Sequence, residues 1–382
     1  MKKRIVLLRH GKPQLCGRES RCIGKGTDPP LSEEGVRQAR RLTEYFAGRN
    51  RIYCSPLLRS RQTAQIVGGE DCTTVRIPDV TEMDMGEWEG LTFSEIRGRF
   101  PKSYAQRGMD WSTPMPGGET LAEAADRMQA AAERLAKAEE EDVVIVTHDG
   151  AIRALLWRIM QLDTTADMIR VPYGSITVLG YDGERLTVGA VGKLPGEAPS
   201  DEEITELWEK ADMPDHIRAH CRAVSRECEK IQESLASAGH LLSQEELRAA
   251  ALLHDLCRQS GRGHEKAAAE ILRQRGYFGA ARMVELHGDG SDGPLDEAQI
   301  LFYADKLYRG AVKVDMEERF RRSEEKCLGE TAKKMHDMRL LRARNIGNEI
   351  EERCGCIMRR QTGRDSYETD ADTGCRGADS LP

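Results

Sequence analysis

The chain has 382 residues, a formal net charge of −7 and 39% hydrophobic residues. A prior of about 100–200 residues per domain predicts two domains. The negative charge argues against a general nucleic-acid binder, and no apolar run approaches the ~18 residues of a membrane span. Met1 to Arg4 lead directly into a short apolar run, unlike a secretory signal, so we expect a cytoplasmic protein.

The first predicted strand is the apolar run Ile5-Val6-Leu7-Leu8, which ends at Arg9-His10-Gly11. Four apolar residues in a row are typical of a strand buried on both faces of a parallel sheet. The carboxyl ends of such strands form the ligand-binding edge of open α/β sheets. Arginine suits phosphate, a neutral imidazole can attack phosphorus, and Gly11 lacks the Cβ that would block close approach.

Two further segments carry residues suited to phosphate chemistry. Residues 51–59 predict the next strand and its exit, with Arg59 at the end of this segment and a helix beginning near Ser60. One interpretation is that Arg59 and Arg61 form a solvated helix start. A cation at a helix N-terminus is unfavourable unless an anion lies there, which favours a phosphate pocket for Arg59. Residues 81–90 then place several carboxylates beside Trp88, where partial burial would raise a carboxyl pKa as a general acid requires.

A second strand repeats the design of the first. Val143 to Val146 form another continuous apolar run, followed by Thr147-His148-Asp149-Gly150. Two histidines brought to one edge of a sheet are hard to explain as core filling, because an unmatched buried polar group costs about 1–3 kcal/mol. Residues 175–181 and 185–191 then predict a β-hairpin that closes the domain.

Several motifs in order make residues 1–192 resemble the histidine phosphatase superfamily, which has the phosphoglycerate-mutase-like fold. They are the R-H-G and T-H-D-G strand ends, D-x-P-L-S-x-x-G from Asp28, S-P-L-x-R-x-x-x-T-A from Ser55 and E-x-x-x-G-x-W-E-G from Glu82. The resemblance implies an α/β three-layer sandwich with a mostly parallel sheet. It also implies a phosphohistidine on His10, Glu82 as general acid and base, and no cofactor. The residues that would contact the phosphoryl group are Arg9, Gly11, Arg59 and His148.

Some details of this resemblance leave alternatives open. Asp84 and Glu89 compete with Glu82 for the role of the acid. Lys12 follows R-H-G where relatives often carry an acidic or small residue, so the substrate contact there is not determined. Residues 100–115 are too short for the insertion of cofactor-dependent mutases, which favours hydrolysis over mutase-type phosphotransfer. The glutamate motif and P-G-G-E-T from Pro116 resemble the α-ribazole phosphatase branch.

The second half of the chain is predicted to be helical. Residues 193–201 have the Pro, Gly and charge content of a linker. From residue 202 the apolar spacing becomes that of helices, and Ala249 to Leu253 are apolar nearly all round, which indicates a buried helix. His254-Asp255 ends that helix. The other histidines and acids that stand out in this half are His220, His264, His287 and Asp305.

The order H…HD…D makes about residues 211–318 resemble the all-α HD-domain phosphohydrolases. The resemblance implies that His220, His254, Asp255 and Asp305 bind a divalent metal, whose identity the residue types do not fix. His264 and His287 match positions that hold a second metal or the phosphate in some relatives. A degenerate HD domain that binds without catalysing remains the alternative. His216 and His240 are expected at the surface.

We therefore expect a two-domain cytoplasmic phosphohydrolase, with a histidine phosphatase domain over 1–192 and an HD domain over 202–358. The first site would act on a small phosphorylated metabolite, and the second would use a metal and could take a nucleotide. A charged helix over about 323–358 would lead into a disordered tail over 359–382, which has too little apolar content to fold alone. The rival hypothesis is a regulatory protein in which the HD domain only binds a phosphorylated ligand.

Overall fold

The computed structural model describes residues 3–15, 19–46, 48–139, 142–164, 169–261, 263–325 and 327–365. The chain divides into two compact units. Unit 1 contains residues 1–197 together with 270–279, and unit 2 contains residues 198–269 and those from 280 onward. The division after residue 197 falls inside the segment predicted as a linker. No helix in the described residues combines the length and the apolar character that a membrane span requires.

Unit 1 is built on a six-stranded sheet of order β3-β2-β4-β1-β5-β6. The strands are β1 (Lys3–Arg9), β2 (Arg51–Cys54), β3 (Thr73–Arg76), β4 (Val143–Thr147), β5 (Ile176–Tyr181) and β6 (Leu186–Lys193). The first four strands in this order are parallel, and β5 and β6 add the predicted antiparallel hairpin at one edge. The mostly parallel sheet confirms the predicted fold class.

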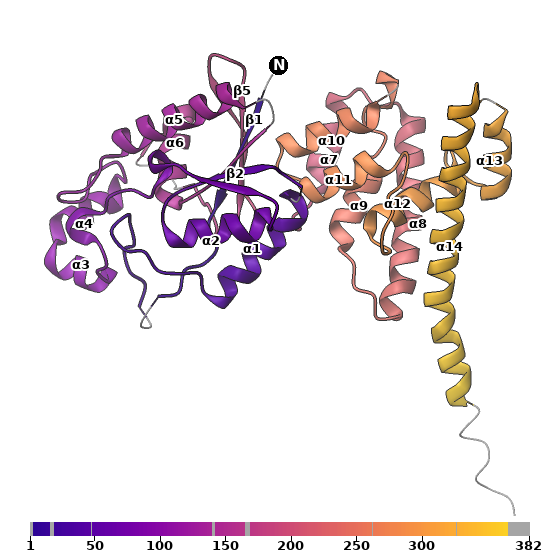
Figure 1. Ribbon diagram of the computed structural model, residues 1–382, viewed down its shortest axis with the longest axis horizontal. Helices are drawn as coiled ribbons and strands as arrows, with labels where there is room; N and C mark the ends of the chain where they lie inside the picture. Colours follow the sequence, from indigo (N-terminus) through magenta and orange to yellow (C-terminus); the bar gives the residue numbers. More distant parts are fainter. Residues whose placement is uncertain are drawn as a thin grey trace, which may run out of the picture. The chain divides into compact units, whose positions relative to one another are not determined.

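Helices cover both faces of this sheet, α1 and α2 on one and α5 and α6 on the other (Figure 1). The helices of unit 1 are α1 (Glu33–Phe46), α2 (Leu58–Gly68), α3 (Phe93–Arg99), α4 (Pro101–Met109), α5 (Leu121–Ala138) and α6 (Asp149–Met160). Alternating side chains of β1 enter two cores: Ile5 and Leu7 pack with α5 and α6, whereas Val6 and Leu8 pack with α1 and α2. This alternation explains why the whole run is apolar.

The helices between β3 and β4 begin at well-defined caps. Thr92 and Glu95 form a capping box at the start of α3, and Thr120 and Glu123 form another at the start of α5. Short 3₁₀ turns, η1 (Pro78–Val80) and η2 (Gly86–Trp88), shape the chain that connects β3 to α3. These turns fix the position of Glu82, which lies between them.

Unit 2 is mostly helical, as predicted. The elements after β6 are α7 (Asp201–Lys210), α8 (Asp215–Ser237), α9 (Gln244–Leu253), η3 (Arg258–Ser260), α10 (His264–Gln274), α11 (Phe278–Leu286), α12 (Glu297–Lys306), β7 (Tyr308–Arg309), β8 (Val312–Lys313), α13 (Met316–Glu324) and α14 (Glu330–Asp365). Helix α9 is buried along most of its length, which confirms the prediction from its apolar sequence. Its rigid position matters because His254 directly follows it.

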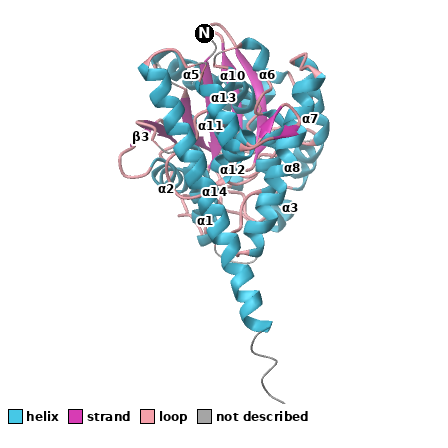
Figure 2. Cartoon of the chain, turned by 90° about the vertical axis from the view of Figure 1, so that its right-hand side faces the viewer, coloured by secondary structure: helices cyan, strands magenta, loops and turns pink. Residues whose placement is uncertain are grey.

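The end of the chain differs from its prediction. The single helix expected over 323–358 is instead divided between α13 and α14, with a break that contains Gly329 at a φ of +88°. A left-handed backbone at that position favours glycine and ends a helix. Helix α14 continues to Asp365, past the predicted start of the tail, and its last turns extend beyond the other helices of unit 2 (Figure 2). Residues 366–382 of the predicted tail lie outside the described residues.

Candidate active sites

The register of the sheet brings the two predicted histidines together. Parallel strands β1 and β4 pair Arg9 with Thr147, so the next residues, His10 and His148, leave the sheet side by side. The backbone N–H of His10 donates to the carbonyl of Thr147 at 3.0 Å. The two imidazole centroids are 4.9 Å apart with the rings edge to face. The sequence prediction that both histidines share one edge of the sheet agrees with this placement.

The imidazole of His10 is held in one tautomer. Its Nδ1 lies 2.7 Å from the carbonyl oxygen of Gly11, and a carbonyl can only accept, so Nδ1 carries the hydrogen. The lone pair is therefore on Nε2. Burial, followed by the charge of Arg59, holds the pKa of His10 well below its usual range. His10 is thus a neutral imidazole with a directed lone pair.

Arg59 approaches the nucleophilic side of His10. Its Nε–H points at His10 Nε2 across 3.3 Å, while the other nitrogens donate to the carbonyls of Thr27 at 2.9 Å and Gly24 at 3.0 Å. The side chain is 1% exposed and lies in the first turn of α2, just beyond β2. A buried guanidinium fixed next to an imidazole lone pair defines an anion position there.

Arg9 and His148 complete the surroundings of His10. The guanidinium of Arg9 stacks on the ring of Tyr173 at 3.8 Å and lies 3.7 Å from Asp149. His148 is fully buried, and neither of its ring nitrogens has a hydrogen-bond partner among the residues that the structure describes. Burial is the largest cause that lowers the pKa of His148, so it too is neutral. A buried imidazole without a partner is costly unless a ligand oxygen meets it.

Glu82 is held at the N-terminus of α6, which starts directly after His148. Its Oε1 accepts from the backbone N–H groups of Met83 at 2.9 Å and Ala151 at 3.0 Å. Its Oε2 has the longer contact, 3.3 Å from the N–H of Gly150. Burial raises the pKa of this carboxyl despite these hydrogen bonds. Oε2 is therefore the oxygen better suited to carry and release a proton.

The two carboxylates that competed with Glu82 have other partners. Asp84 pairs with Lys25 at 2.9 Å and accepts from the N–H of Gly86, which lowers its pKa. Glu89 accepts from the N–H groups of Gly24 and Gly26, and so orders the loop whose carbonyl binds Arg59. These contacts favour Glu82 as the proton donor, as the sequence motif predicted.

Gly11 has a structural role that the sequence did not predict. A Cβ on Gly11 would lie 2.3 Å from the carbonyl oxygen of Gly35, so the glycine permits two backbone segments to pack. Its N–H donates to the hydroxyl of Thr63 at 3.1 Å. Lys12, the departure from the family pattern, pairs with Glu34 at 2.6 Å. Contact of Gly11 with substrate stays a prediction.

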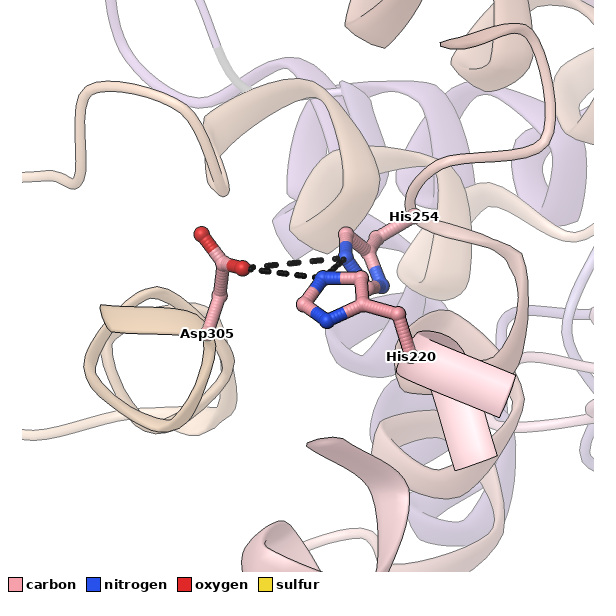
Figure 3. A group of neighbouring side chains, drawn as sticks. All are labelled: His220, His254 and Asp305. Atoms are coloured by element: carbon pink, nitrogen blue, oxygen red, sulfur yellow. Dashed lines mark hydrogen bonds and ion pairs between the residues drawn. The ribbon is translucent and has the colours of Figure 1, made fainter. Parts of the chain in front are cut away.

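The second candidate site gathers histidines and aspartates from separate helices of unit 2. His220 comes from α8, His254 and Asp255 follow α9, and Asp305 comes from α12; Figure 3 shows His220, His254 and Asp305 converging. His254 Nε2 lies 3.3 Å from His220 Nε2, and Asp305 Oδ1 lies 3.2 Å from His220 Nε2. All four side chains are buried. Three of the four predicted ligands, His220, His254 and Asp305, thus form one cluster.

The remaining two predicted histidines lie on the other side of Asp255. Asp255 Oδ2 is 3.8 Å from His220 Nε2 and 3.7 Å from His254 Nε2. Its Oδ1 is 3.1 Å from His264 Nε2 and 3.7 Å from His287 Nε2. Asp255 therefore connects two groups of nitrogen atoms through different carboxylate oxygens.

The tautomers of these histidines are fixed in the same way as that of His10. Each Nδ1 faces a backbone carbonyl, at 2.9 Å for His220, 2.8 Å for His254, 3.1 Å for His264 and 2.6 Å for His287. Each Nδ1 therefore carries a hydrogen, and in the neutral form each Nε2 offers a lone pair. Burial lowers the pKa of His254 to about 4, so it is neutral. Lone pairs and carboxylates that converge in a buried space fit a divalent cation.

Sequence reasoning missed several residues at these sites. Tyr173 stacks on Arg9 and lies 5.6 Å from the His10 ring, but no motif marked it. Glu265 groups with His264 and His287 as a candidate metal ligand, and its position next to His264 was a usable signal. Arg258 donates to Asp255 at 3.1 Å. His216 is exposed as expected, whereas His240 is partly buried and contacts Arg353.

The fold and the two clusters of histidines and carboxylates divide the chain into two domains with separate candidate sites. Family models agree, since "Histidine phosphatase superfamily (branch 1)" matches residues 5–193 and "HD domain" matches residues 217–310. An adenosylcobalamin/α-ribazole phosphatase of Salmonella typhimurium is 31% identical over 167 residues, which cover 42% of this chain and 80% of that protein. The chain belongs to the histidine phosphatase superfamily and carries an HD domain.

Other relatives are less completely covered or structurally less similar. A bifunctional protein of Mycobacterium tuberculosis is 35% identical over 158 residues, 40% of this chain and 43% of that protein, so the match spans less than half of it. The solved structure of a mycobacterial glucosyl-3-phosphoglycerate phosphatase is 26% identical, with a TM-score of 0.43 over 49% of this chain and 98% of that one. These similarities concern unit 1 and leave the substrate of this chain open.

Proposed function

We propose that unit 1 hydrolyses a phosphomonoester through a phosphohistidine on His10. The observation that carries this proposal is the hydrogen bond from His10 Nδ1 to the carbonyl of Gly11, which leaves Nε2 as the nucleophilic atom. Nε2 attacks phosphorus, the N–P bond forms, and the bond from phosphorus to the ester oxygen breaks. Arg9, Arg59 and the N–H of His148 stabilise the charge on the phosphoryl oxygens during transfer.

Glu82 acts in both halves of this reaction. In the first half its protonated carboxyl gives the proton to the departing alkoxide, which leaves as an alcohol. In the second half the resulting carboxylate takes a proton from water, whose oxygen attacks phosphorus and releases His10 and inorganic phosphate. Burial raises the pKa of Glu82, which favours the protonated carboxyl that the first step requires. Hydrolysis of α-ribazole phosphate stays a prediction, because it rests on the resemblance of two motifs and on the similarity to one named relative.

The test uses the full chain with a chelator present, so that any metal-dependent activity of unit 2 is removed. His10→Ala should abolish hydrolysis of p-nitrophenyl phosphate and the acid-labile phosphoryl label on the chain. His216→Ala, which changes an exposed histidine, is the matched control and should keep both. Full chelator-resistant turnover by His10→Ala would overturn the proposal. Transfer of the phosphoryl label to an alcohol instead of water would favour the mutase alternative.

We propose in addition that the HD domain is a metal-dependent phosphohydrolase. Its support is the convergence of the Nε2 atoms of His220 and His254, 3.3 Å apart, with Oδ1 of Asp305, 3.2 Å from His220 Nε2, in a buried space. His220, His254, Asp255 and Asp305 would hold one cation, and Asp255 with His264 and His287 would hold a second. A bound divalent cation would supply Lewis-acid and water-activating chemistry. Arg258 and Lys306, which contact Asp255 and Asp305, orient the carboxylates.

Metal content tests this second proposal without relying on activity. The purified full chain, after growth with added Mn, Fe, Ni and Zn, should contain bound metal by elemental analysis. Asp255→Asn should lower that content, whereas Asp126→Asn, an exposed acid of α5, should not. Absence of metal from the unchanged chain would refute the proposal. Metal without chelator-sensitive hydrolysis in the His10→Ala background would indicate the regulatory, binding-only alternative.

A further inference from the structure

The ring of His220 is oriented by a short hairpin that follows α12. Its Nδ1 lies 2.9 Å from the carbonyl oxygen of Gly310. Gly310 is at the tip of the hairpin formed by β7 and β8, in which Tyr308 pairs with Lys313. The φ of Gly310 is +58°, a left-handed backbone that favours glycine in a two-residue hairpin turn. The direction of His220 Nε2 therefore depends on where this tip lies.

The backbone pairing of the hairpin is too short to fix the tip by itself. Each strand has only two residues, and a two-stranded hairpin is marginally stable at best in water. Both residues of β8 are exposed, so that strand has little packing of its own. Side-chain contacts with the helices of unit 2 must therefore hold the hairpin in place.

Glu227 of α8 supplies two such contacts. Its Oε2 accepts from the hydroxyl of Tyr308 at 3.0 Å, and its Oε1 accepts from Nζ of Lys313 at 2.6 Å. Since Tyr308 and Lys313 lie opposite each other, one carboxylate holds both strands at the base of the hairpin. Glu227 is 6% exposed, and a buried carboxylate requires hydrogen-bond partners. The hairpin provides a donor to each of its oxygens.

Helix α8 carries both the anchor of the hairpin and the histidine that the hairpin orients. Glu227 and His220 are about two helical turns apart, so they lie on one face of α8. On the other side of the hairpin, the guanidinium of Arg319 donates to the carbonyls of Asp305 and Tyr308. The hairpin is thus attached to both helices that present His220 and Asp305 (Figure 3).

We propose that Glu227 is a positioning residue of the candidate metal site. It holds the β7–β8 hairpin so that the carbonyl of Gly310 keeps Nε2 of His220 directed at Asp305, 3.2 Å away. This inference rests on the proposed metal binding of unit 2. Loss of a partner that orients a metal-binding histidine typically lowers metal affinity 10- to 100-fold. Glu227 acts through the hairpin and does not bind the cation itself.

Metal affinity of the full chain tests this inference without an activity assay. The metal-depleted chain is titrated with Co²⁺ in a calorimeter. Glu227→Ala removes both contacts and should weaken binding by about 10- to 100-fold. Glu227→Gln should bind almost as the unchanged chain does, because its amide oxygen can accept from Lys313 while its NH2 donates to the hydroxyl oxygen of Tyr308. A carboxylate that acts only by its charge on the cation would lose its effect in both variants.

NMR gives a second measurement that needs no metal. The chain has nine histidines, so long-range ¹H–¹⁵N spectra of the chain labelled at histidine contain few signals, and His220→Asn identifies those of His220. At alkaline pH, where the imidazole is neutral, the hydrogen of His220 should be on Nδ1 in the unchanged chain and in Glu227→Gln. Glu227→Ala should populate the other tautomer. A general loss of stability would not move this hydrogen in the folded chain.

Glu229→Ala is the matched control, because Glu229 lies on the same helix and pairs with Arg248 at 3.8 Å. It should leave affinity and tautomer unchanged. If Glu227→Ala does not fold, Tyr308→Phe, which removes one hydroxyl, should weaken binding in the same direction by a smaller factor.

Two results would overturn the inference while metal binding stands. One is unchanged affinity and an unchanged tautomer in Glu227→Ala, or unchanged affinity in Tyr308→Phe where it replaces that variant. The other is an equal loss of affinity in Glu227→Ala and Glu227→Gln, which would indicate an effect of charge alone. The proposed metal binding fails by a different result, namely no binding of Co²⁺ by the unchanged chain, and the inference then fails with it.

Discussion

Replacing Glu82 by glutamine isolates the proton-transfer step of the proposed reaction. Glutamine keeps the size of the side chain and one oxygen, which can still accept from Met83 and Ala151 in place of Oε1. It cannot give a proton to the leaving oxygen. Because a general acid contributes about 100- to 10,000-fold, kcat/KM for glycerol 3-phosphate should fall by that factor. Loss on p-nitrophenyl phosphate should be far smaller, since nitrophenolate leaves without a proton.

The same substitution has a structural cost that can be separated from catalysis. The new amide NH2 takes the place of Oε2 and faces the N–H of Gly150, so that two donors meet. An unsatisfied buried donor costs about 1–3 kcal/mol, and each kcal/mol lowers the melting temperature of a domain of this size by roughly 2–4 °C. Calorimetry should show this shift, and assays well below the transition then measure catalysis alone.

The pH dependence provides a further control on Glu82. Its pKa is raised by burial, so the acid form persists above the usual range of a glutamate, and kcat/KM for the alkyl phosphate should fall as pH rises through that pKa. Glu82→Gln should lose this decline. Asp84→Asn should keep it, because the hydrogen bond from Lys25 lowers the pKa of Asp84 and leaves it ionised. Equal losses on both substrates for Glu82→Gln, or a larger loss for Asp84→Asn, would refute the assignment.

Other substitutions test the surroundings of both sites. Arg59→Lys should lower kcat/KM about 10- to 150-fold in steady-state assays, because an ammonium cannot contact His10 and two carbonyls together. This factor corresponds to the loss of one charged hydrogen bond, which contributes about 1.5–3 kcal/mol. Gly11→Ala should destabilise unit 1 by about 1–3 kcal/mol in urea titrations, whereas Gly98→Ala, with nothing within 4 Å of the new Cβ, should not. Chelation should lower the melting temperature of unit 2 by removing a ligand of the native state, and Asp255→Asn should lose that response; an unchanged transition would count against a metal there.

The sequence predicted the positions of the phosphatase residues because they follow strands. His10 and His148 each follow an apolar run, and the carboxyl ends of parallel strands lie at one edge of a sheet. The proximity of the two imidazoles could therefore be predicted without knowing the strand register. The close backbone contact of Gly11 with Gly35 was not predicted, because Gly35 comes from the start of α1. That contact depends on how α1 packs, which local sequence does not determine.

The prediction of the site in the HD domain was limited in a similar way. The order of histidines and aspartates along the helices predicted which residues gather, but not how the carboxylate of Asp255 divides its two oxygens between two groups of histidines. That division depends on the tertiary packing that brings His220 and His264 to different oxygens of Asp255. The carbonyl that orients His220 belongs to Gly310, in the loop between β7 and β8, and could not be identified from the sequence. The tail beyond residue 365 lies outside the described residues, so the expectation for it stays a prediction.

Both sites contain buried histidines held in the same tautomer, but the charges beside these histidines have opposite signs. In each, a backbone carbonyl takes the Nδ1 hydrogen of a buried histidine and leaves the Nε2 lone pair directed inward, as in His10 and His254. Arg9 and Arg59 flank His10, so the local field favours a phosphoryl anion and disfavours a metal cation. Asp255 and Asp305 flank His254, so the local field favours a cation. The same neutral imidazole is thus suited to attack phosphorus in one unit and to bind a metal in the other, which is why chelation should affect only unit 2.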